Sequence, residues 1–272
     1  MSGESSARMR TVLLHAGAVL MALWILIPIY VITAAAFSSP EAVFSFPKPL
    51  VPEISTETME FFLGATGVLP ALRRSVVVAF STLALAIVIG TPAGYALARF
   101  RFRGADAFRV SIVSTRAFPI VILSIPLAVT FIRFGIDDSS VGLTLMHTAL
   151  ALPFTVLVTS SVFAGISEEL EEAAMTLGCS RFSAVRRVVL PLALPGLAAA
   201  AIFTWIISWN EVFAASILTL RNRTLPAQVL VALTQSGLPF QFAGGFLLLA
   251  PALVVVFVIR KYLFDLWGRV AR

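Results

Sequence analysis

Long apolar runs separated by short polar connections are the dominant pattern along the 272 residues. A helix that crosses the hydrocarbon core of a membrane needs about 20 consecutive apolar residues. The pattern predicts six membrane-spanning helices, at 12–36, 75–98, 110–133, 141–165, 193–218 and 241–264. We therefore expect an all-α membrane protein in which residues 1–272 form a single transmembrane domain.

Composition supports this assignment. Hydrophobic residues make up 59% of the chain and charged residues 12%, whereas a soluble domain carries about 25% charged residues. The first apolar run continues from Val12 to Phe37, which is longer than the apolar core of about 7–15 residues in a signal peptide. We therefore expect this run to be the first span.

The distribution of Lys and Arg predicts the orientation in the membrane. If both termini lie on one side, the segments on that side carry thirteen basic residues and the opposite segments carry six. Basic residues are retained on the cytoplasmic side, so the bias predicts that both termini are cytoplasmic (N-in, C-in). The net charge of +6 then reflects membrane topology, and nucleic acid is not an expected partner.

Residues suited to catalysis or metal binding are few. Cys179 is the single cysteine, and the two histidines, His15 and His147, are far apart in the sequence, so we predict neither a disulfide nor a metal site. The nucleotide-binding pattern GxxxxGK[ST] is absent. We therefore expect no catalytic residue and no cofactor in this chain.

One charged segment, EEAAMTLGCSRFSAVRRVVLPLALPG at 171–196, interrupts the apolar pattern. Between Ser167 and Leu177 the apolar residues recur at i, i+3, i+4 and i+7, which predicts one stripe of an α-helix; they are Leu170, Ala173, Ala174 and Leu177. Ser167 is a candidate N-cap, and Gly178 is a candidate C′ residue with positive φ.

A second short helix is predicted from Arg181 to Leu190, with Phe182 and Val185 on one side and Pro191 and Pro195 ending it. Residues 166–191 would then form a helix–Gly–helix elbow between two spans. The pattern permits a protein-docking element, a solvated loop or a helix on the inner leaflet. Four Glu and two Ala are poorly suited to the leaflet, since a membrane-surface helix is rich in basic residues and bulky apolar anchors.

The same residues resemble a known family. Glu172-Ala173-Ala174, three residues, Gly178, nine residues, Val188, one residue and Leu190-Pro191 resembles the EAA loop of ABC importer permeases, with Val in place of Ile at 188. GYALARFRFRG (94–104), STRAFPIVILSIP (114–126), LPFTVLV (152–158) and SWNE (208–211) resemble the carbohydrate-importer permeases related to the maltose system. The chain departs from many of them at Leu177, where they have Asp, and in ending at WGRVAR without a longer tail.

The resemblance implies a type I ABC importer permease fold in a bacterial or archaeal inner membrane, crossed several times. It implies a transport subunit without enzyme activity that forms half of the pathway for a sugar, polyol or related glycoside. A separate cytoplasmic ATPase dimer would bind ATP and Mg²⁺ and receive the elbow as a coupling helix. The implied coupling residues are Glu171, Glu172, Ala173, Ala174, Leu177, Gly178, Phe182, Leu190 and Pro191.

Two further partners are implied by the resemblance. A second permease subunit would complete a heterodimer, and an extracytoplasmic solute-binding protein would land on the outer segments 37–70 and 219–240. Within the first outer loop, about 37–74, the stretch TETMEFFLG predicts a short helix that lies on the membrane surface or contacts a partner.

Polar residues within spans are candidates for the translocation pathway because their burial in lipid is costly. Arg116 lines the pathway, pairs with a carboxylate, or lies outside a misplaced span boundary. His147 is packed between helices or lines the pathway. The group Trp209, Asn210 and Glu211 either binds a polyhydroxylated ligand or joins two helices.

Two alternatives remain at the level of sequence. An ABC importer permease for another polar solute carries the same elbow. A secondary transporter driven by an ion gradient would show symmetric halves and paired acidic residues near the midplane, neither of which is evident in this sequence.

Overall fold

The computed structural model describes residues 2–47, 53–233 and 236–270, with side chains described for 9–47, 53–231, 236–255 and 257. The chain divides into two compact units. The first comprises Met1–Thr66 and Ala232–Leu249, and the second comprises Gly67–Val231 and Ala250–Arg272. Residues 48–52 and 234–235, which belong to the predicted landing segments, lie outside the described residues, as do the last two residues of WGRVAR.

The first unit contains α1 (Ser2–Ala36), α2 (Pro40–Phe44), α3 (Glu57–Gly64) and the beginning of α13 (Leu238–Val270). Phe62 of α3 is fully buried, and its ring centroid lies 4.6 Å from that of Phe240 in α13. The hydroxyl of Thr58 donates to the Ser38 carbonyl oxygen at 2.7 Å and fixes α3 to the chain that follows α1. The helix predicted in TETMEFFLG is confirmed as α3.

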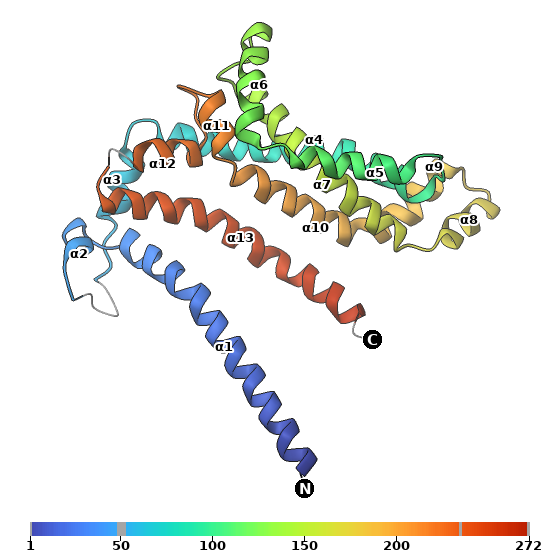
Figure 1. Ribbon diagram of the computed structural model, residues 1–272, viewed down its shortest axis with the longest axis horizontal. Helices are drawn as coiled ribbons and strands as arrows, with labels where there is room; N and C mark the ends of the chain where they lie inside the picture. The colour runs from blue at the N-terminus through green and yellow to red at the C-terminus, as the bar shows by residue number, and fades with distance from the viewer. Residues whose placement is uncertain (1, 48–52, 234–235, 271–272) are drawn as a thin grey trace. The chain divides into compact units, whose positions relative to one another are not determined.

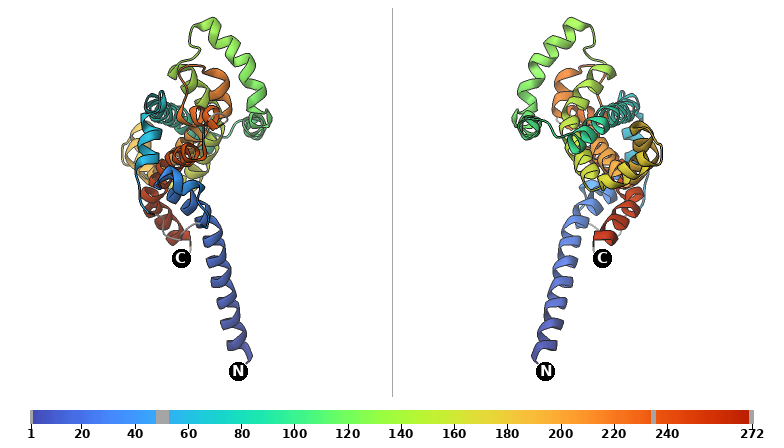
Figure 2. Two further views of the ribbon diagram at one scale, coloured as in Figure 1. Left: turned by 90° about the vertical axis from the view of Figure 1, so that its left-hand side faces the viewer. Right: turned by 90° about the vertical axis from the view of Figure 1, so that its right-hand side faces the viewer.

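Three long helices form the core of the second unit: α4 (Val68–Arg99), α7 (Ser140–Ala164) and α10 (Leu190–Trp209). They run alongside one another in Figures 1 and 2, and each packs against the other two. The elbow helices α8 and α9 lie at one end of this bundle, and α6 and α11 lie at the other (Figure 1).

Small residues allow these helices to approach closely, which is how helices associate in a lipid environment. A Cβ added to Gly94 of α4 would overlap Thr159 of α7, and one added to Gly196 of α10 would overlap Val162. Thr159 donates its hydroxyl hydrogen to the Gly90 carbonyl oxygen at 2.9 Å. The Thr155 and Thr204 hydroxyl oxygens lie 2.8 Å apart between α7 and α10. Polar side chains thus join the three helices from within.

The predicted third span, 110–133, is broken rather than continuous. It comprises α5 (Ala105–Ser114), the 3₁₀ turn η1 (Thr115–Ala117) and α6 (Ile120–Phe134), with a bend of 88° between the two limbs (Figure 2). Pro119 lacks an N–H and disfavours the helical conformation of the residue before it. Phe118 accordingly has extended backbone angles, φ −80° and ψ 122°.

The predicted fifth span, 193–218, also has different limits. Its helix begins in α9 (Arg181–Ala184), continues through a π-helical turn η2 (Val185–Val189) and ends with α10 at Trp209. The sequence predicted that Pro191 ends the second elbow helix. This prediction is wrong, because the helix continues through Pro191 into α10. The Leu190 N–H donates to the Val185 carbonyl across the wider turn, and a π turn is one of the usual ways in which a helix absorbs a local irregularity.

After Trp209 the chain leaves the helix and forms two short helices, α11 (Phe213–Leu218) and α12 (Leu225–Leu233). Ala214, Ala215 and Leu218 of α11 pack in one apolar cluster with Phe131 of α6 and Leu143 of α7. Within the described residues, five helices are long and apolar enough to cross a membrane, or six if the bent pair forms one span.

Candidate functional site

The elbow between α7 and α10 is built by local capping interactions. Ser167 accepts a hydrogen bond from the Glu169 N–H at 3.3 Å at the start of α8 (Glu168–Thr176). At its end, Gly178 has φ +91°, its N–H bonds to the Met175 carbonyl at 3.0 Å, and the Cys179 N–H bonds to the Ala174 carbonyl at 3.1 Å. These two bonds form a Schellman motif. The predicted N-cap and C′ glycine are both confirmed.

The apolar stripe predicted on α8 is buried at only one of its four residues. Ala174 is buried, but Leu170 and Ala173 are exposed, and Leu177 is 87% exposed. The residue that shares the buried face with Ala174 is Glu171, which is 3% exposed. Most of the apolar stripe therefore points away from the bundle, where a partner can contact it.

Glu171 can be buried because three side chains pair with its carboxylate or donate hydrogen bonds to it. Arg99, at the end of α4, places Nε 3.3 Å from Glu171 Oε2, and the Tyr95 hydroxyl donates to Oε1 at 2.5 Å. Arg181, at the start of α9, donates from Nε to Oε1 at 3.3 Å. Buried charges are tolerated only when they are paired and hydrogen-bonded, as this carboxylate is.

The partners of Glu171 are themselves held in place. Arg99 also donates from Nη2 to the Ile166 carbonyl oxygen at 2.9 Å, so it bonds both to the α7–α8 connection and to α8 itself. Arg181 lies over the Phe100 ring, 4.9 Å from its centroid, and the Tyr95 ring meets the Phe163 ring edge-on. We call Glu171, Arg99, Tyr95 and Arg181 the elbow clamp. It fastens α8 and α9 to the end of α4.

The exposed surface of the elbow is apolar at its bend and acidic along α8. Phe182 is 78% exposed and Leu177 is exposed beside Gly178, while Glu168, Glu169 and Glu172 are also exposed. Of the other residues named as coupling candidates, Leu190 packs against an internal cluster, and Pro191 is exposed at the start of α10. The predicted residues therefore divide between an exposed bend and its buried support.

The candidates for a translocation pathway also divide into two groups. His147 of α7 is buried, and its Nδ1 lies 2.8 Å from the Ser208 hydroxyl oxygen of α10. Its Nε2 lies 3.5 Å from Glu211 Oε2, an ion-pair distance without a hydrogen bond. Glu211 accepts from the backbone N–H groups of Ala214 and Ala215 at 2.9 and 2.8 Å. This cluster fixes the turn between α10 and α11.

Trp209 is buried and stacks on Trp205, with ring centroids 5.1 Å apart and planes inclined by 11°. Arg116 in η1 and Asn210 after α10 are exposed. Sequence reasoning thus named His147 and Glu211 separately, and the structure places His147 Nε2 3.5 Å from Glu211 Oε2. Arg116 is not part of this cluster.

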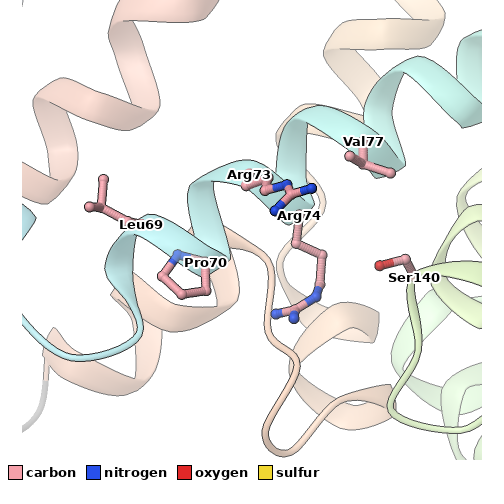
Figure 3. A pocket seen from close by; sticks show the side chains of 6 residues that line it. All are labelled: Leu69, Pro70, Arg73, Arg74, Val77 and Ser140. Carbon is pink, nitrogen blue, oxygen red and sulfur yellow. The ribbon is translucent and has the colours of Figure 1, made fainter.

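A further polar cluster, which the sequence did not indicate, lies at the end of the bundle opposite the elbow. Asp138 has φ +45°, and its Oδ1 accepts from the N–H groups of Leu220 at 3.0 Å and Asn222 at 2.9 Å. Arg74 of α4 donates to Asn222 Oδ1 at 2.8 Å and to the Arg223 carbonyl at 3.1 Å. Figure 3 shows Arg73 and Arg74 beside a pocket that Ser140 also lines. These bonds give the 219–224 loop a defined shape.

The elbow clamp predicts a specific pattern of stability losses. Glu171→Ala leaves Arg99 buried without its carboxylate and should lower the free energy of unfolding by about 3–5 kcal/mol. Glu172→Ala, the adjacent exposed glutamate, is the matched control and should change it by less than about 0.5 kcal/mol. Thermal melting of the purified chain in detergent measures both. In a double-mutant cycle, Arg99→Ala with Glu171→Ala should cost less than the sum of the single changes; full additivity would mean that the two side chains do not interact.

Comparison with known proteins places the chain in a family. Residues 86–267 match the family described as binding-protein-dependent transport system inner membrane component. The chain is 34% identical over 195 residues to a putative ABC transporter permease protein of Streptomyces antibioticus, covering 70% of this chain and 85% of that one. It is 32% identical to a diacetylchitobiose uptake system permease protein of Streptomyces coelicolor, covering 71% of each. It is 36% identical over 164 residues to a molybdate/tungstate transport system permease protein of Thermococcus kodakarensis, covering 60% and 65%.

The fold has a solved counterpart. A chain of a bacterial ABC transporter involved in the import of the acidic polysaccharide alginate superposes with a TM-score of 0.74 at 23% identity, over 94% of this chain and 97% of that one. The resemblance drawn from the EAA-like loop is confirmed by the family match, and six membrane helices agree with the upper count of spans. The chain is a non-enzymatic, multi-pass membrane subunit that belongs to the binding-protein-dependent transport system inner membrane component family, the permeases of ABC importers.

Proposed function

We propose that this chain forms half of the translocation pathway of an ATP-driven importer for a sugar, polyol or related glycoside, and that residues 166–191 couple it to the ATPase. The observation that carries the proposal is that the elbow clamp holds an exposed bend, with Leu177 and Phe182 at its surface, against the end of α4 through the buried Glu171. A cytoplasmic ATPase dimer is the proposed partner of this bend, with ATP and Mg²⁺ bound by that dimer.

The orientation we propose places the elbow and both termini in the cytoplasm. Basic side chains gather at the elbow end of the second unit, on the end of α4, on the chain after it, and on α9 and η2; they are Arg99, Arg101, Arg103, Arg109, Arg181, Arg186 and Arg187. The positive-inside rule assigns such an end to the cytoplasmic side. The Asp138 cluster and the Arg73 pocket then face outward. Segments 37–70 and 219–240 are the proposed landing surface for a solute-binding protein.

The mechanism follows from how the elbow joins the three core helices. α7 runs into α8 through the short turn at Gly165–Ser167, and α9 continues through η2 into α10 without interruption. α4 has no such continuity, and Arg99 and Tyr95 attach it through Glu171. A displacement of the elbow by the ATPases therefore reaches all three helices together.

ATP and a loaded binding protein must both favour the outward-facing state if transport is to be driven by nucleotide. Ala173 leaves room for close approach at the elbow surface, while Glu172 supplies an exposed carboxylate beside it. A second permease subunit, in a heterodimer, would present its own elbow to the other ATPase. This arrangement lets closure of the ATPase dimer draw the two elbows together.

For the pathway itself we propose Arg116 and Asn210 as the solute-facing residues. Both are exposed within a segment that the sequence assigns to a membrane span, and an exposed arginine there is costly unless it faces a polar space. His147, Trp209 and Glu211 support Asn210 from within, because their interactions with Ser208, Trp205 and α11 fix the end of α10. The second permease subunit would supply the opposite wall.

The proposed class of solute is inferred from the solutes named for related permeases. The diacetylchitobiose permease of Streptomyces coelicolor and a trehalose transport system permease protein of Mycobacterium tuberculosis favour a saccharide. The molybdate/tungstate permease of Thermococcus kodakarensis favours the alternative, an importer of another polar solute. A gradient-driven transporter is set aside because the family is that of ABC importer permeases.

The melting transition of the cognate solute-binding protein distinguishes the two solute classes. A ligand at 100 times its dissociation constant stabilises a protein by about 2.7 kcal/mol. We expect a mono- or oligosaccharide to raise the melting temperature, and molybdate or tungstate to leave it unchanged. A rise with the oxyanions alone would replace the saccharide with the alternative solute.

Gly178→Asp tests the coupling role of the elbow. The new carboxylate would point into the ATPase contact, and an unpaired buried charge costs several kcal/mol, so uptake per ATP hydrolysed should fall at least about tenfold while the chain still inserts. Gly135→Asp is the matched control, because Gly135 also has positive φ (+65°) and open space around its Cβ position but lies at the other end of the bundle. Uptake of labelled solute and phosphate release are measured in proteoliposomes. Equal coupling in the two variants would remove the elbow from the mechanism.

A further inference from the structure

A short stretch after α4 combines exposed basic and aromatic side chains. Its sequence is FRFRGADAFR, from Phe100 to Arg109, and we call it the Phe–Arg segment. Arg101 and Arg103 are exposed and alternate with Phe100 and Phe102, which are each 47% exposed. Nothing in the coupling mechanism uses Arg101 or Arg103. Their role therefore requires a separate explanation.

The segment forms a hollow rather than a flat surface. Arg101, Arg103 and Arg109 line a cavity of about 540 Å³ together with Phe100, Phe102 and Glu168, so its lining carries three guanidinium groups and one carboxylate. Arg109 is held in position, since its guanidinium bonds to Asp106 Oδ1 at 3.0 Å and to the Leu97 carbonyl at 2.9 Å. In the described part of the chain, no hydrogen bond or ion pair engages the side chain of Arg101 or Arg103. Two guanidinium groups are thus available to a ligand.

The helix α5, which begins within the Phe–Arg segment, indicates the medium in which this hollow lies. No residue of α5 is buried in the described structure, and the apolar side chains of Phe108, Val110 and Val113 are exposed. Such a helix is suited to an apolar medium, while the arginines beside it are suited to anions. Arginine's planar fork matches phosphate oxygens, and phenylalanine side chains occur on the apolar face of helices that lie at the boundary between lipid headgroups and acyl chains.

The Phe–Arg segment is mainly basic and the neighbouring elbow mainly acidic, and the two meet at Glu168. α8 exposes Glu168, Glu169 and Glu172, so a protein surface complementary to it would be basic. A basic surface would repel Arg101 and Arg103, which disfavours one protein partner covering both. An anionic lipid leaflet attracts these arginines, and juxtamembrane basic residues bind such leaflets.

We propose that the Phe–Arg segment is a binding site for the phosphate headgroup of an anionic phospholipid. Arg101 and Arg103 contact the phosphate oxygens, Arg109 completes the positive wall, and Phe102 and Phe108 enter the acyl region. The site lies next to the elbow clamp, because Phe100 is the ring over which Arg181 lies. The bound lipid therefore steadies the end of α4 at the point where Glu171 is attached. The inference depends on membrane location and not on the coupling mechanism.

Native mass spectrometry of the full-length chain, titrated with phosphatidylglycerol or with phosphatidylcholine of the same acyl chains, tests the site. Wild type should retain phosphatidylglycerol in preference to phosphatidylcholine. The double change Arg101→Gln and Arg103→Gln should weaken phosphatidylglycerol binding by about 25-fold. The charge-preserving pair Arg101→Lys and Arg103→Lys should keep most of it. Arg73→Gln with Arg221→Gln removes the same charge from exposed positions at the other end of the bundle and should have little effect.

Three results would overturn the proposal. The first is that wild type retains phosphatidylglycerol and phosphatidylcholine equally. The second is that the double Gln variant and its control lose phosphatidylglycerol binding to the same extent. The third is that the double Gln variant binds lipid as wild type does but no longer co-purifies with the ATPase. The last would make the segment a protein contact. If the double variant does not fold, the single Arg101→Gln and Arg103→Gln variants should each weaken binding about fivefold, and unchanged binding in both would contradict the site. Because the readout is lipid retention, it stands apart from the tests of transport.

Discussion

The ion pair between Glu171 and Arg99 is the interaction on which the rest of the second unit depends. Both side chains are almost completely buried, and their nearest charged atoms lie 3.3 Å apart. Removing two charges from water is expensive, and their attraction offsets that cost only when the remaining hydrogen-bonding capacity is used. Tyr95, Arg181 and the Ile166 carbonyl oxygen use it here. A buried ion pair is weak evidence for stability by itself, so its value lies in the connection that it makes.

That connection matters because the bundle is held together by shape rather than by hydrophobic burial. In lipid, apolar side chains gain little by facing one another, and helices associate through close contact and internal hydrogen bonds. Gly90, Gly94 and Gly196 permit this contact, and the Thr155–Thr204 pair adds polar bonds inside it. We therefore expect the three helices to move as one body from the elbow to the Asp138 cluster. A displacement of the elbow should then also displace the opposite end of the bundle.

Features of the elbow that depend on neighbouring residues in the sequence were predictable. Ser167 and Gly178 occupy capping positions whose chemistry is local, and both lie where the sequence placed them. The orientation of α8 was not predictable in this way, because an i, i+3, i+4, i+7 stripe does not show which face of the helix packs on the bundle. The bundle buries Glu171, since Arg99 and Arg181, which lie elsewhere in the chain, pair with it. A glutamate three residues before Ala174, on the same helical face, was the available signal.

The effects of two prolines on helix continuity were also predicted wrongly: one breaks a span that was expected to be continuous, and the other lies inside a helix that it was expected to end. Pro119 breaks the third span, although the apolar run there is continuous in sequence. Pro191, expected to end a helix, lies inside a continuous one because the π-helical turn before it rearranges the hydrogen bonds. The family could be recognised from the EAA-like loop because its fixed residues are close together in the chain. The His147–Ser208–Glu211 cluster could not be assembled from sequence, because it depends on how α7 packs against α10.

The central claim is that the elbow and α4 move as one body, and the distance between them measures this directly. Spin labels at Glu169 on α8 and Val88 on α4, both exposed, with Cys179 changed to Ser, allow double electron–electron resonance in the assembled transporter. The account predicts one narrow distance that is the same without nucleotide and with ATP, and a broad distribution when Glu171→Gln is added. A wild-type distance that shifts when ATP binds would show that the elbow moves independently of α4, and would contradict the claim.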